Sequence, residues 1–225
     1  MPGLLDPPDL PELEPASLRL DDTRTLRLEG ALVDATEGRT VDAVGAESEL
    51  PRRIVIRESE LRGVTLRAPK PAAFELRDVR LHGCDLSNAQ AMNASISRVE
   101  VLSSRLVGFR AAESDVRELR IADSSLVLAT FAFAQLRHVS FERVDLSEAT
   151  FMNAQLDGVE FVDCRLAGAD FRGARLNACA IRGTPLDGVL GVDSLRGLRM
   201  PWADVVDSVA ALAAALGIEI ESDDA

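Results

Sequence analysis

The chain has 225 residues, of which 47% are apolar and only 4% aromatic, and its formal net charge is −12. This composition is apolar enough to build a folded core, and the excess of carboxylates argues against direct binding to nucleic acid. The first 15 residues are acidic and hold five prolines, unlike a signal peptide, and no window approaches the roughly 18 consecutive apolar residues of a membrane span. Three cysteines at unpatterned spacing are typical of a reducing compartment. We therefore expect a soluble cytoplasmic protein with no membrane partner.

The negative charge belongs to the two ends of the chain. Residues 52–187 contain 19 basic and 18 acidic side chains, whereas residues 1–51 contain four and 12, and residues 188–225 contain two and seven. The proline-rich residues 1–15 are typical of a disordered acidic tail. We expect an irregular N-terminal cap over residues 16–53, with short strands at 25–28 and 31–33 on either side of Gly30.

The central segment, residues 54–188, repeats every five residues. Counted from Ile56 in steps of five to Leu186, 24 of 27 positions are Leu, Ile, Val or Phe, and the exceptions are Pro71, Ala91 and Ala111. Two residues before each such position, 22 of 27 residues are Ala, Ser, Cys, Thr or Val. One of the exceptions is compensated, because the large Phe109 precedes the small Ala111. A period of five fits neither the 3.6 period of a helix nor the 2.0 period of a strand.

A coil whose every side is one five-residue unit explains this spacing. Four units make a square turn, and successive turns stack at about 4.8 Å, so that each turn satisfies its backbone groups with the turns on either side. One large and one small residue of each unit then point into the axis, and the remaining three face outward. The pattern predicts an all-β solenoid of about seven coils, since neither inward residue could be buried within one turn alone.

The units AGADF at 167–171, SEATF at 147–151 and SNAQA at 87–91 resemble the pentapeptide-repeat family, whose consensus is A(D/N)LXX. The resemblance extends over about 135 residues and implies a right-handed quadrilateral β-helix. It also implies a distant relation to quinolone-resistance members, which mimic DNA, bind gyrase and dimerise through their C-terminal ends.

Residues 189–225 predict a loop followed by an amphipathic α-helix. Pro201 suits the start of this helix and Gly217 its end. Its apolar residues recur at helical spacing and are Trp202, Val205, Val206, Val209, Leu212 and Leu216. The helix either caps the apolar end of its own solenoid or forms a dimer contact, and the sequence leaves both interpretations open.

Large apolar residues also occupy outward positions on two adjacent sides of the predicted coil. They are Met92, Val107, Val127, Leu128, Phe133 and Met152, with Ala112 and Ala132 between them. Residues 20 apart occupy the same place on neighbouring turns, so this set forms one patch. Exposed apolar patches usually mark a contact surface, unless in this chain the N-terminal segment folds over it.

No arrangement of residues predicts catalysis. His82 and His138 fall at outward positions on different sides, and Cys84, Cys164 and Cys179 fall at small inward positions, so we expect no metal site, no cofactor and no enzymatic activity. The pattern favours a non-catalytic protein-interaction or scaffold module with an unidentified partner. The alternative is a DNA mimic that binds or protects DNA gyrase, favoured by the acidic ends and the terminal helix. Mimicry needs a dense line of carboxylates, and no side of the predicted coil carries one.

Overall fold

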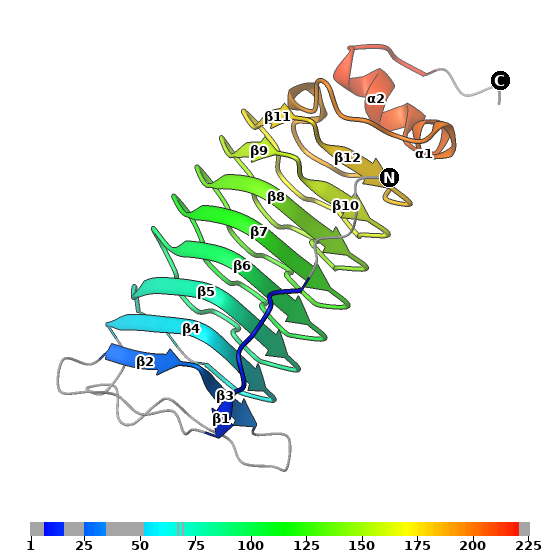
Figure 1. Ribbon diagram of the computed structural model, residues 1–225. Coiled ribbons are helices and arrows are strands. Elements are labelled where there is room, and N and C mark those ends of the chain that lie inside the picture. Colours follow the sequence, from blue (N-terminus) through cyan, green and yellow to red (C-terminus); the bar gives the residue numbers. More distant parts are fainter. Residues whose placement is uncertain (1–6, 16–24, 35–51, 67, 69, 221–225) are drawn as a thin grey trace.

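The computed structural model describes residues 7–15, 25–34, 52–66, 68 and 70–220. Figure 1 shows them as a rod of stacked coils with two short helices at the C-terminal end. The strands are β1 (Glu14–Pro15), β2 (Thr25–Glu29), β3 (Ala31–Asp34), β4 (Arg53–Arg62), β5 (Ala73–His82), β6 (Ser95–Leu102), β7 (Asp115–Ala122), β8 (Gln135–Glu142), β9 (Gln155–Asp157), β10 (Glu160–Val162), β11 (Arg175–Asn177) and β12 (Ala180–Arg182). The helices are a 3₁₀ turn, η2 (Val192–Ser194), and the α-helices α1 (Trp202–Asp207) and α2 (Val209–Ala215).

The strands pair in parallel with a fixed step of 20 residues. Ile56 pairs with Leu76, and the same column continues through six such steps to Leu176. Twenty residues in units of five give four sides per turn, and we number them by their inward residues: side 1 holds Ile56, side 2 Leu61, side 3 Leu66 and side 4 Pro71, each repeated every 20 residues. Strands β4 to β8 bend across sides 1 and 2, and isolated parallel bridges join the turns on sides 3 and 4. The predicted all-β solenoid is confirmed.

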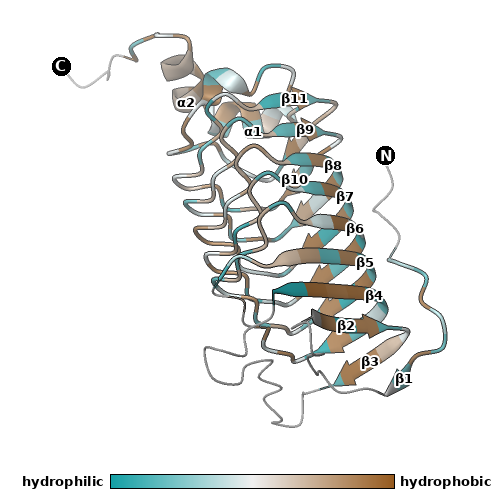
Figure 2. Cartoon of the chain, turned by 90° about the vertical axis from the view of Figure 1, so that its left-hand side faces the viewer, coloured by the Kyte–Doolittle hydropathy of each residue, from teal (hydrophilic) through white to brown (hydrophobic). Residues whose placement is uncertain are grey.

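Burial follows the five-residue pattern. Of the 27 large positions, 25 are buried; Pro71 is exposed and Leu176 half-buried. All 26 described small positions, two residues earlier, are buried as well. The rings of Phe131, Phe151 and Phe171 stack along side 4 with centroids 5.3 and 4.8 Å apart, an arrangement that stabilises beyond area burial. Figure 2 shows the resulting alternation of hydrophobic and hydrophilic stretches, repeated from coil to coil.

Polar side chains at small inward positions have hydrogen-bond partners in the neighbouring turn. The backbone N–H of Ser104 donates to Oγ of Ser124 at 2.9 Å, and Oγ of Ser124 donates to the carbonyl of Ala122 at 2.7 Å. The thiol of Cys164 donates to the carbonyl of Phe141 at 3.3 Å. Buried hydroxyls and thiols are therefore tolerated because none of these is left without a partner.

The coil turns its corners with left-handed backbone. The residue two positions after nearly every large inward residue has a positive φ, for example 58° at Asn88, 55° at Asn93 and 67° at Gly108. Glycine and asparagine adopt this conformation at little cost, whereas other residues pay roughly 1–2 kcal/mol. The corners of the square are therefore the positions where residue choice is most constrained by backbone geometry.

The N-terminal end differs from the expected irregular cap. Strands β2 and β3 lie where short strands were predicted and pair with β4, so residues 25–34 form a further coil. Its step to the next coil is 28 residues, since Leu28 pairs with Ile56. Residues 16–24 and 35–51 of the predicted cap lie outside the described residues.

Part of the predicted acidic tail lies against the rod. Strand β1 pairs with β3, and the carbonyl of Pro8, a buried residue, accepts a hydrogen bond from Nη2 of Arg80 at 2.7 Å. Residues 7–15 therefore lie over side 2 and run across the strands of successive coils in Figure 1, while residues 1–6 lie outside the described part. None of the helices in the described part of the chain is long and apolar enough to cross a membrane.

Candidate functional site

The predicted apolar patch lies on sides 3 and 4, midway along the rod. Leu128 is 53% exposed and Phe133 58% exposed, and they stand at the two corners that bound side 4 in the same turn. The other predicted members, Met92, Val107, Val127 and Met152, are half-buried. Parallel bridges between Arg110 and Thr130, and between Thr130 and Thr150, hold these turns in register. The structure thus places the six predicted residues on one continuous surface, with Leu128 and Phe133 protruding furthest.

Both protruding side chains sit on strained backbone. Leu128 has a φ of 61° and Phe133 a φ of 59°. The preceding corners of the Leu128 column are Gly108 and Asn88, which tolerate this conformation, and those of the Phe133 column are Glu113, with a φ of 57°, and Asn93. The square coil imposes this conformation at its corners, but core packing does not explain why two large apolar side chains occupy these exposed corners.

Charged residues of opposite sign flank the Leu128 corner. Arg105 and Arg110 lie one turn before it, are exposed, and form no ion pair with the described residues. Asp145 and Glu148 lie one turn after it. At the Leu128 corner the patch is therefore basic on one axial side and acidic on the other.

The described part of the N-terminal segment does not cover this patch. It crosses side 2, where Arg80 holds Pro8, and side 2 is opposite side 4 in a four-sided coil. The sequence left open whether the N-terminal segment folds over the patch, and residues 7–15 do not.

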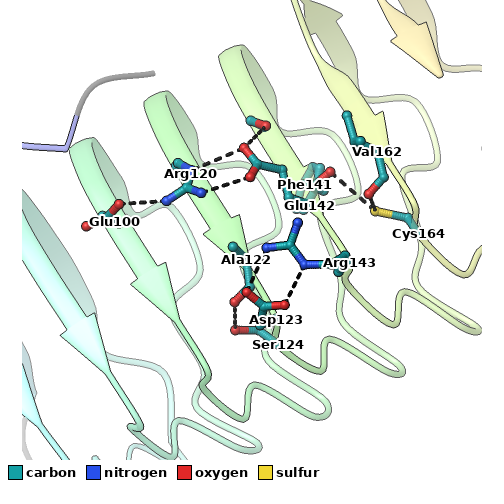
Figure 3. Close-up of polar contacts among 11 residues, drawn as sticks. Glu100, Arg120, Ala122, Asp123, Ser124, Phe141, Glu142, Arg143, Val162 and Cys164 are labelled. Atoms are coloured by element: carbon teal, nitrogen blue, oxygen red, sulfur yellow. Dashed lines mark hydrogen bonds and ion pairs between the residues drawn. The ribbon is translucent and has the colours of Figure 1, made fainter. Parts of the chain in front are cut away.

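Side 2 carries a polar network that the sequence analysis did not single out (Figure 3). Arg120 donates from Nη1 to Oε1 of Glu100 and from Nη2 to Oε2 of Glu142, both at 2.8 Å. Burial would raise the pKa of Glu142, but the hydrogen bonds from Arg120 and Ser140 outweigh it and hold that pKa below its usual value. Both carboxylates are buried and paired with Arg120, so the network holds three turns together.

The C-terminal helices present their apolar face to solvent. Trp202 is 79% exposed, Val206 52% and Val209 56%. Ala211 and Leu212 pack against the core, and Val205 is half-buried, while Leu216 is exposed. The predicted single helix is interrupted at Ser208, between α1 and α2.

Polar side chains, unnoticed in the sequence, close the end of the coil. Oδ2 of Asp204 accepts a hydrogen bond from the backbone N–H of Gly183 at 2.8 Å, and Oγ of Ser208 accepts one from Leu186 at 3.2 Å. Both side chains are buried. The helix pair therefore covers the last turn with these two hydrogen bonds as well as with Ala211 and Leu212. Nothing in the sequence marks a serine and an aspartate within a helix as capping groups.

Comparison with known proteins identifies the repeat. Residues 124–161 and 154–189 match the sequence profile of the family described as pentapeptide repeats, in eight copies, and the five-residue burial pattern continues in the turns before them. Residues 124–189 are pentapeptide repeats, and the turns before them share the five-residue pattern.

Solved pentapeptide-repeat structures resemble this protein at low identity. A trypsin-treated form of QnrB1, a plasmid-mediated fluoroquinolone resistance protein, is 18% identical with a TM-score of 0.42, covering 87% of this chain and 97% of its own. HetL, involved in heterocyst differentiation regulation in the cyanobacterium Nostoc, is 17% identical with a TM-score of 0.44, covering 78% and 86%. Among curated proteins no match was found.

The reactive residues of this protein are kept apart. His82 is exposed, whereas Cys84 is buried, and within the described residues no group of three or more His, Cys, Asp and Glu side chains is placed to hold a metal ion. Burial raises the pKa of the Cys84 and Cys164 thiols to about 11 and also raises the pKa of Cys179. These thiols therefore stay protonated at neutral pH and act as packing groups.

Proposed function

We propose that this protein is a non-catalytic module that binds another protein through the Leu128–Phe133 patch. The observation that carries the proposal is the exposure of two large apolar side chains, Leu128 and Phe133, at neighbouring corners of one turn. Contiguous exposed apolar surface marks contact sites. The three free, buried cysteines favour a reducing compartment such as the cytoplasm for this role.

The charge arrangement favours this role over DNA mimicry. A mimic must present unpaired carboxylates where phosphates would lie. Several carboxylates on the rod are instead neutralised by arginines one turn away, as in Arg98–Asp78, Arg120–Glu142 and Arg143–Asp123. A pairing of opposite charges along the axis cancels the field that a DNA-binding enzyme would read.

The test replaces both patch residues by asparagine, the residue that other corners of the same columns carry. Leu128→Asn/Phe133→Asn should abolish capture of the cellular partner while the rod stays folded. Capture by the wild type should change little between low and high salt, because an apolar contact is not screened. A partner retained by the double variant, or inhibition of gyrase supercoiling that disappears at high salt and ignores the two substitutions, would refute the proposal.

We further propose that two copies associate through the C-terminal helices. Trp202, Val206 and Val209 recur at helical spacing on the solvent side of α1 and α2, and the cap itself uses other residues. A helix face with this apolar exposure is typical of a subunit contact.

Val206→Glu/Val209→Glu tests this association without disturbing the cap. Because both side chains are already more than half exposed, the change should leave the melting temperature within a few degrees of the wild type. Light scattering should show a dimer for the wild type and a monomer for the variant. Equal masses for the two proteins would exclude this contact.

A further inference from the structure

We infer that the Leu128–Phe133 patch receives an amphipathic α-helix of its partner, lying along the rod with its N-terminus over Asp145 and Glu148 and its C-terminus over Arg105 and Arg110. The inference rests on the proposed function and specifies the partner's secondary structure and direction. Three features of the patch support it: its backbone, its dimensions and its charges.

The backbone of the patch is not free to accept a strand. The N–H of Leu128 donates to the carbonyl of Ser147, and the N–H of Phe133 donates to the carbonyl of Met152, both at 3.0 Å. Every turn on side 4 is bonded to the next in the same way, as Thr130 is to Phe109. A partner strand could add only at an open sheet edge, so recognition here must pass through side chains. A helix satisfies its own backbone and presents side chains alone.

The dimensions suit a short helix laid along the axis. Met92 and Met152 bound the patch on side 4 and are three turns apart, about 14 Å at the spacing of paired strands. A helix covers that length in about nine residues, enough for apolar anchors at i, i+4 and i+7. Between the corner residues the outward side chains are short, Thr130 and the buried Ala132. Leu128 and Phe133 therefore flank a low strip of side 4, and the two methionines at its ends adapt readily to a partner.

The charges around the Leu128 corner set the direction. A helix carries partial positive charge at its N-terminus and partial negative charge at its C-terminus, each effective within one turn. Asp145 and Glu148 lie one turn after Leu128, and Arg105 and Arg110 one turn before it. At the Phe133 corner the preceding turn carries Glu113 and the following turn the neutral Asn153, so the bipolar arrangement belongs to the Leu128 corner. A helix antiparallel to the rod satisfies both charged groups, and the parallel direction opposes both.

The experiment selects binders from a displayed library of random 16-residue peptides against the immobilised full chain. Enriched peptides should carry apolar residues at i, i+3 or i+4, and i+7, should gain helicity on binding, and should lose at least tenfold in affinity to Leu128→Asn or Phe133→Asn. A photo-cross-linker at the peptide C-terminus should label the turn of Arg105 and Arg110, and one at the N-terminus the turn of Asp145 and Glu148. Ala178→Asn is the matched control, since it replaces an exposed left-handed corner residue (φ 52°) away from the patch and should leave affinity unchanged.

The outcomes separate this inference from the proposed function. Enriched peptides without helical spacing, no enriched peptide at all, or the opposite pattern of cross-links would overturn the inference, even if the cellular partner is lost from the double asparagine variant. Capture of the cellular partner by that double variant would overturn the proposed function itself. Because asparagine suits a left-handed corner better than leucine or phenylalanine, both patch variants should melt no lower than the wild type. A loss of binding therefore cannot be attributed to unfolding.

Discussion

Phe151→Ala tests whether the stacked phenylalanines hold the rod together. Phe151 is fully buried, lies between Phe131 and Phe171 in the side 4 column, and contacts Phe141 and Phe161 edge-on with centroids 6.2 and 5.9 Å away. Truncation of a buried phenylalanine costs about 3–5 kcal/mol. The loss of four aromatic contacts places this site at the upper end, about 4–5 kcal/mol.

Chemical denaturation followed by circular dichroism measures this cost, and a thermal melt should fall by roughly 10 °C for a chain of this length. Phe133→Ala is the matched control, because the same truncation at a 58% exposed ring should cost less than about 0.5 kcal/mol. If Phe151→Ala cost under about 1.5 kcal/mol, or if the two variants were equally destabilised, the axial column would not be the source of stability.

Three further changes test other parts of the coil. Phe109→Ala and Ala111→Phe should each destabilise the protein by about 1–4 kcal/mol, while the double exchange should recover most of the loss in a double-mutant cycle, because together they restore the regular large-and-small order. The pKa of Glu142 is lowered in the folded protein, so the stability that its charge contributes is present above its ordinary pKa and is lost as pH falls. The free energy of unfolding, measured by denaturation between about pH 6 and pH 3, should therefore depend less on pH for Glu142→Gln than for the wild type. Ser208→Ala should cost about 1–3 kcal/mol in urea denaturation, because it leaves the buried N–H of Leu186 without its acceptor, and Asp204→Ala should cost less, because the N–H of Gly183 is only partly buried. If both variants cost less than about 0.5 kcal/mol, these hydrogen bonds do not stabilise the end of the coil.

The sequence predicted the coil because one physical requirement repeats along it. Each side must bury one large and one small residue, so the pattern at Leu156, Phe161 and Leu166 is read without reference to distant parts of the chain. Even the exception at Phe109 was interpretable, since it is buried and packs edge-on against Phe74 at 6.4 Å. Because each repeat contacts only its neighbours, the fold of the coil can be predicted from the local sequence pattern.

The two ends were predicted less well because each is built from contacts that occur once. The 28-residue step between Leu28 and Ile56 breaks the register by which the strands before β4 could have been aligned. At the other end, helical periodicity correctly located an amphipathic helix, but it could not reveal which face meets the coil. The orientation of the helix depends on the N–H groups of Gly183 and Leu186, which have no further turn to bond to and donate to Asp204 and Ser208 instead. The requirement is visible only once the last turn has been placed.

The candidate patch was predicted as a set of outward positions, and its geometry came from the structure. Side-chain alternation placed Leu128 and Phe133 outside the coil, but their left-handed φ values follow from the corner positions of the square. Sequence reasoning gave the corners no special status. The corner geometry is what distinguishes these two residues from the half-buried Val107 and Val127 beside them.

The fixed step of 20 residues makes each turn of the rod an interchangeable cassette. Leu128 and Phe133 both lie within residues 115–134, a single complete turn from β7 to the start of β8. Excision of that segment would join Ser114 to Gln135, which are already neighbours because the N–H of Gln135 donates to the carbonyl of Ser114. Every column would stay in register, and the rod would be shorter by about 4.8 Å. Deleting one residue instead would displace all later side chains from their columns. A lineage of such proteins can therefore gain, lose or relocate a binding surface by duplicating or deleting whole turns, without redesigning the scaffold that displays it.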